Sequence, residues 1–135
     1  MFNHSNDPLD FLFGVKQILN ESGIFIIEVP YWKIQIENYR FDMVYHEHIT
    51  YFTVRSLKKL IEDAGLFIND IEIVESHGGS LRVIGGKKFA ENDKVNKMIS
   101  DEINSGILNI EYYLKAAHKI KAIRAKTMDK IFQIN

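Results

Sequence analysis

A short and almost wholly apolar run, Ile24 to Val29, constrains the fold of this chain more than any other segment. The run is rich in β-branched residues, and Pro30 closes it. Strands that are buried on both faces have this composition, whereas a strand with one face in water alternates apolar and polar residues. The run therefore predicts a central strand over residues 24–29, covered on both faces, in a chain built around a sheet.

Two segments with helical periodicity flank this strand. The first has Asp7 as its N-cap, followed by a proline, and we expect it to span residues 8–21. The second follows Thr53, a suitable N-cap, and stops at Gly65, where a residue without a Cβ adopts left-handed geometry freely. We expect this helix over residues 54–64. Its apolar face consists of Leu57, Leu60, Ile61 and Ala64.

Two further apolar segments predict an antiparallel pair of strands. Residues 66–75 form the first, with a bulge at Asn69-Asp70, and a tight connection with two glycines leads to the second, residues 80–84. The fold class is therefore α/β. A sheet of three strands is thin for helices on both faces, so the unit looks like half of a larger one. The core residues expected in the first strand are Ile68, Ile71 and Ile73.

The character of the sequence changes after Gly86. Residues 94–104 form a weakly apolar helix, and Asn104-Ser105-Gly106 ends it. A long amphipathic helix with a basic face then runs to Phe132. Its apolar stripe is wider than the rest of the chain can cover, so we expect it to pack against the rest of a longer chain or a second subunit. The stripe contains Ile110, Tyr113, Leu114, Ala117, Ile120, Ile123, Met128 and Ile131.

The composition limits the class of protein. The chain has 135 residues, which is a single-domain length, and a net charge of -1, which gives no general attraction to nucleic acid or anionic lipid. It has no cysteine, which excludes disulfides and thiolate metal sites and favours a cytoplasmic protein. No apolar run approaches the ~20 residues of a membrane span. The first residues do not have the pattern of a secretory signal.

The densest group of titratable side chains is Tyr45-His46-Glu47-His48. Apolar neighbours such as Val44 and Ile49 indicate a partly buried segment, and partly buried titratable groups concentrate at functional sites. Each histidine taken alone could equally be a satisfied core residue. In a strand, both histidines would share one face and could ligate a metal with His77, although the spacing of His77 does not demand this.

Glu28 is an unusual residue near the end of a buried strand. The more common explanation is that it faces solvent at the strand terminus. In open α/β sheets, however, ligands bind at the carboxyl ends of strands, and Pro30, Tyr31 and Trp32 would line such a crevice.

Three runs in this order and spacing resemble the sugar C-methyltransferases. They are residues 7–31, the Tyr-His-Glu-His run within residues 41–52, and His-Gly-Gly-Ser-Leu-Arg at residues 77–82. The resemblance covers about residues 3–88 and is weaker from Glu91 onward. The sugar C-methyltransferases are class I S-adenosylmethionine-dependent enzymes that act on nucleotide-linked 4-keto-deoxy sugars. The resemblance implies the C-terminal half of a Rossmann-like methyltransferase sheet, with an antiparallel last strand, followed by a long amphipathic helix.

The sequence also departs from that family, which has a cysteine-rich zinc module, a glycine-rich cofactor loop and a second α/β domain. None of these is present here. The resemblance therefore implies a partial methyltransferase domain with the catalytic loop at residues 1–88 and a helical connector to a missing C-terminal domain at residues 89–135. It implies a fragment that is inactive alone. Its partners would be a nucleotide-sugar substrate and either the missing halves of the enzyme or a second copy, bound through the C-terminal helix.

Methylation at a carbon beside a ketone needs a base and a group that stabilises the enolate. The resemblance implies that His48 is the general base, with Tyr45, Glu47 and His4 as active-site partners, and that S-adenosylmethionine is bound mainly by the missing regions. Substrate contacts are expected at His77, Ser80 and Arg82. Arg82 would suit a phosphate, although a surface ion pair is the commoner fate of an arginine. Alternative functions are another class I methyltransferase, acting on oxygen or nitrogen, and a non-catalytic fragment that binds a partner through its last helix.

Overall fold

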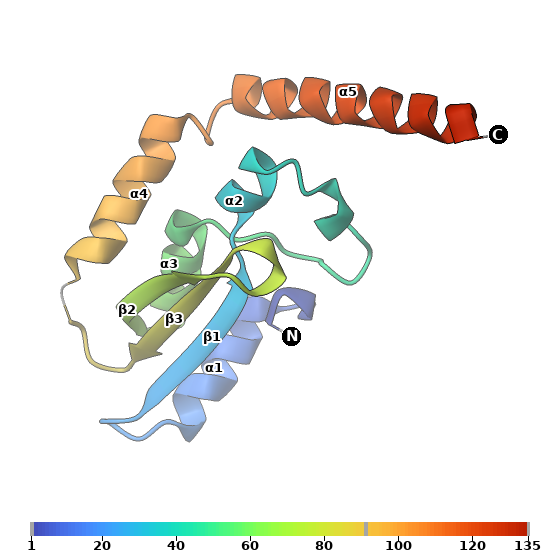
Figure 1. The fold of residues 1–135 in the computed structure, drawn as a ribbon. Coiled ribbons are helices and arrows are strands. Elements are labelled where there is room, and N and C mark those ends of the chain that lie inside the picture. The colour runs from blue at the N-terminus through green and yellow to red at the C-terminus, as the bar shows by residue number, and fades with distance from the viewer. Residues whose placement is uncertain (1, 91, 135) are drawn as a thin grey trace.

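The computed structural model describes residues 2–90 and 92–134, so Met1, Glu91 and Asn135 lie outside the described residues. The chain forms a three-stranded sheet with helices packed on it, followed by two C-terminal helices (Figure 1). The strands are β1 (Ile24–Pro30), β2 (Phe67–Val74) and β3 (Ser80–Gly86). The helices are α1 (Pro8–Ile18), α2 (Trp32–Glu37), α3 (Val54–Asp63), α4 (Asp93–Ser105) and α5 (Ile110–Ile134), with short 3₁₀ helices η1 (Phe2–His4), η2 (Phe41–Met43) and η3 (Ser76–Gly78).

Strand β3 lies between β1 and β2 and runs antiparallel to both. Strands β1 and β2 are therefore parallel to each other, joined by a crossover that contains α2, η2 and α3. The predicted α/β fold, with an antiparallel last strand and a long C-terminal helix, is confirmed. The predicted bulge is confirmed as well, because the register of β2 against β3 shifts between Ile68 and Asp70. This topology places the carboxyl ends of β1 and β2 and the start of β3 at one edge of the sheet.

Strand β1 lies at an edge of the described sheet, so the prediction of a central strand covered on both faces is wrong for this structure. Its alternate residues are buried, whereas Ile24 and Ile26 are 61% and 60% exposed. The core assignment of Ile73 is also wrong, since Ile73 is 53% exposed although it pairs with the buried Leu81. An apolar residue on an edge strand is buried only where another element covers it, and apolar composition alone does not reveal that cover.

Helices α1 and α3 pack on the same face of the sheet, behind it in Figure 1. Both predicted N-caps are confirmed: the Asp7 carboxylate accepts the amides of the first turn of α1, and Thr53 forms a capping box with Ser56. Helix α1 ends at Ile18, earlier than residue 21. There, Leu19 is extended and the Asn20 side chain accepts the Ser22 amide at 3.0 Å, which turns the chain into β1.

Helix α4 is attached to the sheet through a buried carboxylate. The Glu102 side chain accepts the backbone amide of Val54 at 2.5 Å and that of Arg55 at 3.1 Å. These are first-turn amides of α3, which no carbonyl inside that helix can accept, and a negative charge there complements the helix dipole. No sequence pattern singles out Glu102, because a glutamate in a weakly apolar helix is ordinarily solvated.

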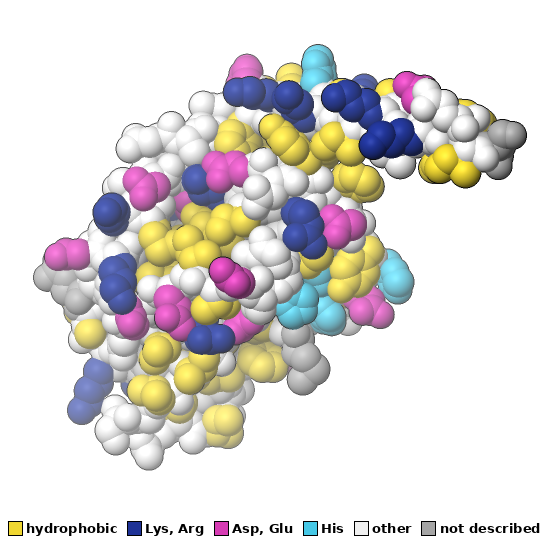
Figure 2. Space-filling view, viewed as in Figure 1, with side chains coloured by type: hydrophobic (Ala, Val, Ile, Leu, Met, Phe, Trp, Pro, Cys, Tyr) yellow, Lys and Arg dark blue, Asp and Glu magenta, His cyan; other side chains and the backbone are white. Residues whose placement is uncertain are grey.

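Helix α5 follows Gly106, whose φ of +79° confirms the predicted break, and extends away from the sheet (Figure 1). Only Ala116 is fully buried in the part of α5 that the structure describes. Apolar side chains such as Ile110 and Leu114 are exposed, and Figure 2 shows apolar side chains along the side of α5 that faces the rest of the molecule. The packing of this stripe against a partner stays a prediction. None of the described helices combines the length and apolar composition that a membrane crossing needs.

Candidate active site

The Tyr-His-Glu-His run lies in a turn between η2 and α3, not in a strand. We call residues 41–52 the site loop. Partial burial is confirmed for His48, which is 7% exposed, but the prediction is wrong for Val44 and Ile49, which are both more than half exposed. The His46 side chain is 89% exposed. In a turn, neighbouring side chains point in different directions, so apolar neighbours do not imply burial of the whole segment.

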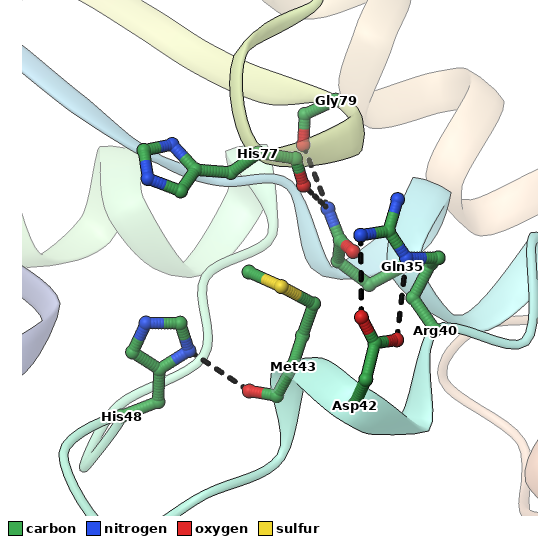
Figure 3. A network of polar contacts seen from close by, with 7 residues as sticks. All are labelled: Gln35, Arg40, Asp42, Met43, His48, His77 and Gly79. Carbon is green, nitrogen blue, oxygen red and sulfur yellow. Dashed lines mark hydrogen bonds and ion pairs between the residues drawn. The ribbon is translucent and has the colours of Figure 1, made fainter.

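Both ring nitrogens of His48 are hydrogen bonded. Nδ1 lies 2.8 Å from the carbonyl oxygen of Met43, and Nε2 lies 2.9 Å from the hydroxyl of Tyr45. A carbonyl oxygen only accepts, so Nδ1 carries the hydrogen, and in the neutral ring Nε2 accepts from the Tyr45 hydroxyl. Figure 3 shows Nδ1 directed at the Met43 carbonyl. The backbone therefore fixes the tautomer that leaves Nε2 available for proton transfer.

The N-terminal turn η1 brings a second histidine to the site. The centroid of the His4 ring lies 5.2 Å from that of His48. Phe2 anchors η1 by stacking on Phe52 of the site loop at 5.4 Å, and the carbonyl of the buried Asn3 accepts amides of the same loop. Sequence reasoning did not find Asn3, and no local pattern marks it, because its burial depends on a contact far along the chain.

A small cleft of about 140 Å³ lies at the edge of the sheet where β1 and β2 end. Figure 2 shows histidine side chains gathered in one area of this face. The structure brings together every site residue named from the sequence except Glu47 and Arg82. Glu47 is exposed and lies 4.0 Å from His46. The cleft is lined by Asn3, His4, Glu28, Pro30, Tyr45, His48, His77 and Ser80.

His77 lies in the β2–β3 connection, opposite the site loop (Figure 3). Its φ of +53° is rare for a residue with a Cβ, and such conformations cluster at functional sites. The buried Gln35 supports it: Nε2 of Gln35 donates to the carbonyls of His77 at 3.3 Å and Gly79 at 2.9 Å. Gln35 was missed by the sequence analysis. Its only sequence signal is a polar residue between two isoleucines in a short helix.

Glu28 supplies the negative charge of the cleft. The Ser76 hydroxyl donates to Oε1, and Nε of Arg82 donates to Oε2 at 3.0 Å. These hydrogen bonds, that of Ser76 first, hold the pKa of Glu28 below its ordinary value, so the group is ionised at neutral pH. Arg82 also donates to Glu72 at 2.9 Å and is thus shared between two carboxylates. Arg82 therefore forms ion pairs, which is the commoner of the two fates considered for it from the sequence. Ser80 donates to the Ser76 carbonyl at 2.9 Å.

The residues expected beside Glu28 separate in the structure. Pro30 lines the cleft, whereas Tyr31 is buried in the core. Burial, followed by the charge of Glu102, raises the pKa of the Tyr31 phenol. Trp32 packs against Tyr51 of the site loop, with ring centroids 4.6 Å apart, and so supports the loop from outside the cleft.

A metal centre at the histidines was the other interpretation of the sequence. Within residues 2–90 and 92–134, no group of three or more histidine, aspartate or glutamate side chains is placed to hold a metal ion. His46 and His48 do not share a face, since one is solvent-exposed and the other is buried.

Comparison with known proteins places the chain among enzymes of one class. Residues 1–69 match the family described as "Methyltransferase domain", and residues 75–135 match the family described as "C-methyltransferase C-terminal domain". The chain therefore belongs to the methyltransferase domain family. One curated relative is the C-methyltransferase NovU of Streptomyces niveus, which is 32% identical over 133 residues. The match covers 96% of this chain and 32% of the relative, so the chain spans about a third of that protein's length.

Proposed function

We propose that this chain supplies the proton-abstracting part of an S-adenosylmethionine-dependent C-methyltransferase. Its substrate is a nucleotide-linked 4-keto-deoxy sugar, and the methyl group goes to a ring carbon beside the keto group. The observation that carries the proposal is the hydrogen-bonded series Met43–His48–Tyr45, of which His48 and Tyr45 line the cleft. The name of the Streptomyces niveus relative supports carbon as the atom that is methylated.

His48 acts as the general base through Nε2. The proton leaves the carbon beside the keto group and binds Nε2, and the electron pair of the C–H bond moves into the enolate. Nδ1–H continues to donate to the Met43 carbonyl, which stabilises the imidazolium that forms. General-base catalysis of this kind typically contributes about 10²–10⁴-fold in rate.

Tyr45 couples proton uptake to stabilisation of the enolate. While Nε2 is unprotonated, the Tyr45 hydroxyl donates to it across 2.9 Å. Nε2 has one lone pair, so the phenolic hydrogen must turn away before that nitrogen can take the substrate proton, and it then donates to the keto oxygen that becomes the enolate oxygen. The Tyr45 side chain is 41% exposed, so it has room for this rotation. The same hydroxyl thus orients the base in the free site and donates to the keto oxygen during the transfer.

The remaining site residues bind and orient the sugar. His4 and His77 flank the cleft from the N-terminal turn and from the strand connection, and both present ring nitrogens that donate or accept hydrogen bonds. Glu47 is exposed and is not among the residues that line the cleft, so its expected role is contact with a sugar hydroxyl rather than with the reacting carbon. Ser80 already donates to the Ser76 carbonyl, so its oxygen is left as an acceptor.

S-adenosylmethionine is the methyl donor that the methyltransferase family implies. The residues that line the cleft do not fit it. A cleft of about 140 Å³ is smaller than the ~300–1,000 Å³ of pockets that enclose ligands of such size. The segment from Pro30 to Trp32, after β1, contains no glycine that would let the backbone approach a cofactor closely. The residues of this chain therefore act on the sugar, and other parts of a complete enzyme would hold the donor.

Methylation of oxygen or nitrogen is the second candidate function. Such a reaction removes a more acidic proton and forms no enolate. It would therefore not need a phenol hydrogen bonded to the imidazole base. A non-catalytic role, in which α5 binds a partner, rests on the exposed apolar side chains of that helix. The hydrogen-bonded pair in the cleft favours carbon methylation over both.

Deuterium exchange tests the proposal without any methyl donor. The chain is incubated in D₂O with a nucleoside diphosphate 4-keto-deoxy sugar, and NMR follows the loss of the proton signals beside the keto group. The wild-type chain is expected to exchange one of them faster than buffer does. His48→Asn removes the titrating group and should lower the catalysed rate by about 10²–10⁴-fold. His46→Asn is the matched control, because His46 is an exposed neighbour.

The outcomes separate the hypotheses. Exchange no faster than buffer with wild-type chain would refute the proposed function. If His48→Asn catalyses deuterium exchange at the wild-type rate and His46→Asn does not, His46 is the base and the roles of the two histidines must be swapped. Methyl transfer itself is measured in a chimera in which residues 1–135 replace the matching residues of the Streptomyces niveus relative. Tyr45→Phe in that chimera should lower turnover while His48 remains in place.

A further inference from the structure

The carboxylate of Glu28 is the charged group of the cleft that proton abstraction does not use. We propose that Glu28 is a substrate-binding residue that selects the sugar, accepting a hydrogen bond from one ring hydroxyl on the strand side of the cleft. This inference rests on the proposed function, because it takes the ligand of the cleft to be a sugar.

Glu28 is held in place before any ligand arrives. It comes from the carboxyl end of β1, where the backbone is paired with β3 and Glu28 lies opposite Arg82. Ser76, in the next connection, donates to Oε1, and Arg82 donates to Oε2 from Nε at 3.0 Å. Two hydrogen bonds from two different elements fix both oxygens, so binding a ligand there costs little side-chain entropy.

One acceptor position of this carboxylate stays open toward the cleft. A carboxylate has about four lone-pair sites. Oε2 faces the Arg82 guanidinium, with Nε and the terminal nitrogen both at 3.0 Å, whereas among the residues that the structure describes Oε1 accepts from Ser76 alone. The side chain is 32% exposed and lines the cleft, so a ligand can reach the remaining site on Oε1.

The charge of the site decides what binds there. Glu28 is ionised, Arg82 is shared with Glu72, and no lysine or arginine is among the residues that line the cleft, so this side of the cleft offers an acceptor. A hydroxyl donates to a carboxylate through a charge-assisted hydrogen bond, which is about twice as strong as a neutral one. A phosphate would instead be repelled. The sugar ring therefore faces Glu28, and the diphosphate of the nucleotide lies elsewhere.

Glu28 is not a second base for the reaction. Its hydrogen bonds to Ser76 and Arg82 favour the charged form and lower its pKa, which makes it a weak base. The His77 side chain in the same cleft acts in the same direction on that pKa. A weakly basic carboxylate in a fixed position is suited to recognition rather than to proton abstraction.

The test is a binding cycle with the chain as it exists. NMR signals of the histidine rings report binding of a nucleoside diphosphate 4-keto-deoxy sugar and of analogues that each lack one ring hydroxyl. Glu28→Gln replaces the charged acceptor oxygen either with a neutral amide oxygen, which accepts a weaker hydrogen bond, or with an NH₂ group, which only donates. It should weaken binding of the parent sugar by about 10-fold, up to 100-fold. One analogue should bind equally to wild-type chain and Glu28→Gln, because the hydroxyl that Glu28 recognises is already absent from it.

Glu72→Gln is the matched control, since it removes the other carboxylate of Arg82 without touching the cleft. It should bind every sugar like the wild type. The role of Glu28 would be overturned if Glu28→Gln lost the same affinity for the parent sugar and for every analogue. It would also be overturned if Glu28→Gln bound the parent sugar as tightly as the wild type does. In both results the wild-type chain still binds the sugar and the proposed function stands. A wild-type chain that binds no sugar would overturn both the proposed function and this inference.

Discussion

Replacement of Glu102 by alanine tests how the C-terminal helices are joined to the sheet. The Glu102 carboxylate accepts two backbone amides at the start of α3, from Val54 at 2.5 Å and Arg55 at 3.1 Å, in a buried position. Alanine leaves both amides without an acceptor, and an unsatisfied buried donor costs about 1–3 kcal/mol. Loss of a cap charge at a helix N-terminus adds a few tenths to about 1 kcal/mol.

The sum is about 2–7 kcal/mol of unfolding free energy, toward the lower end where water reaches the Arg55 amide. Domains of this size are stable by about 5–15 kcal/mol, so a loss of this size would move the urea midpoint clearly. Glu102→Gln keeps one acceptor oxygen and should fall between alanine and wild type. Circular dichroism in urea measures the difference, provided that the slope of unfolding is unchanged.

Asp101→Ala is the matched control, because Asp101 is an exposed acid one residue earlier in the same helix. It should change stability by no more than about 0.5 kcal/mol. If Glu102→Ala costs less than ~1 kcal/mol, or no more than Asp101→Ala, the two amides find other acceptors and the account of this junction is wrong.

The chain alone should not bind S-adenosylmethionine tightly, because its cleft is small and lacks a glycine-rich loop; micromolar binding by calorimetry would contradict this. The exposed stripe of α5 should be protected by a second copy or by the rest of a longer chain. A monomer by light scattering with rapid amide exchange along α5 would refute that expectation. Stability should fall as pH rises above ~10, because burial raises the pKa of Tyr31 and the unfolded phenol loses its proton first. Tyr31→Phe should reduce this fall in alkaline denaturation curves, and an unchanged curve would show that Tyr31 does not titrate with unfolding.

Local chemistry was enough to predict the elements of the fold. Asp7 and Thr53 cap helices because their side-chain oxygens accept amides within a few residues, which is a property of the sequence alone. Gly106 ends a helix for an equally local reason. The Tyr45–His48 pair also lies within one turn, so the segment could be singled out as a candidate site before the fold was known.

Tertiary structure alone decided the place of each element and the content of the cleft. The run from Ile24 to Val29 predicts a strand, but its position at an edge depends on which strands pair with it. Glu28, Gln35 and Glu102 obtain their roles from partners more than forty positions away in the sequence: Ser76, the carbonyls of His77 and Gly79, and the amides of α3. Such contacts leave no periodic pattern in the sequence. The sequence by itself thus determined where the strands and the long helices form. Packing decided which polar groups are buried together, because the cost of an unpaired buried charge is set by its neighbours in space.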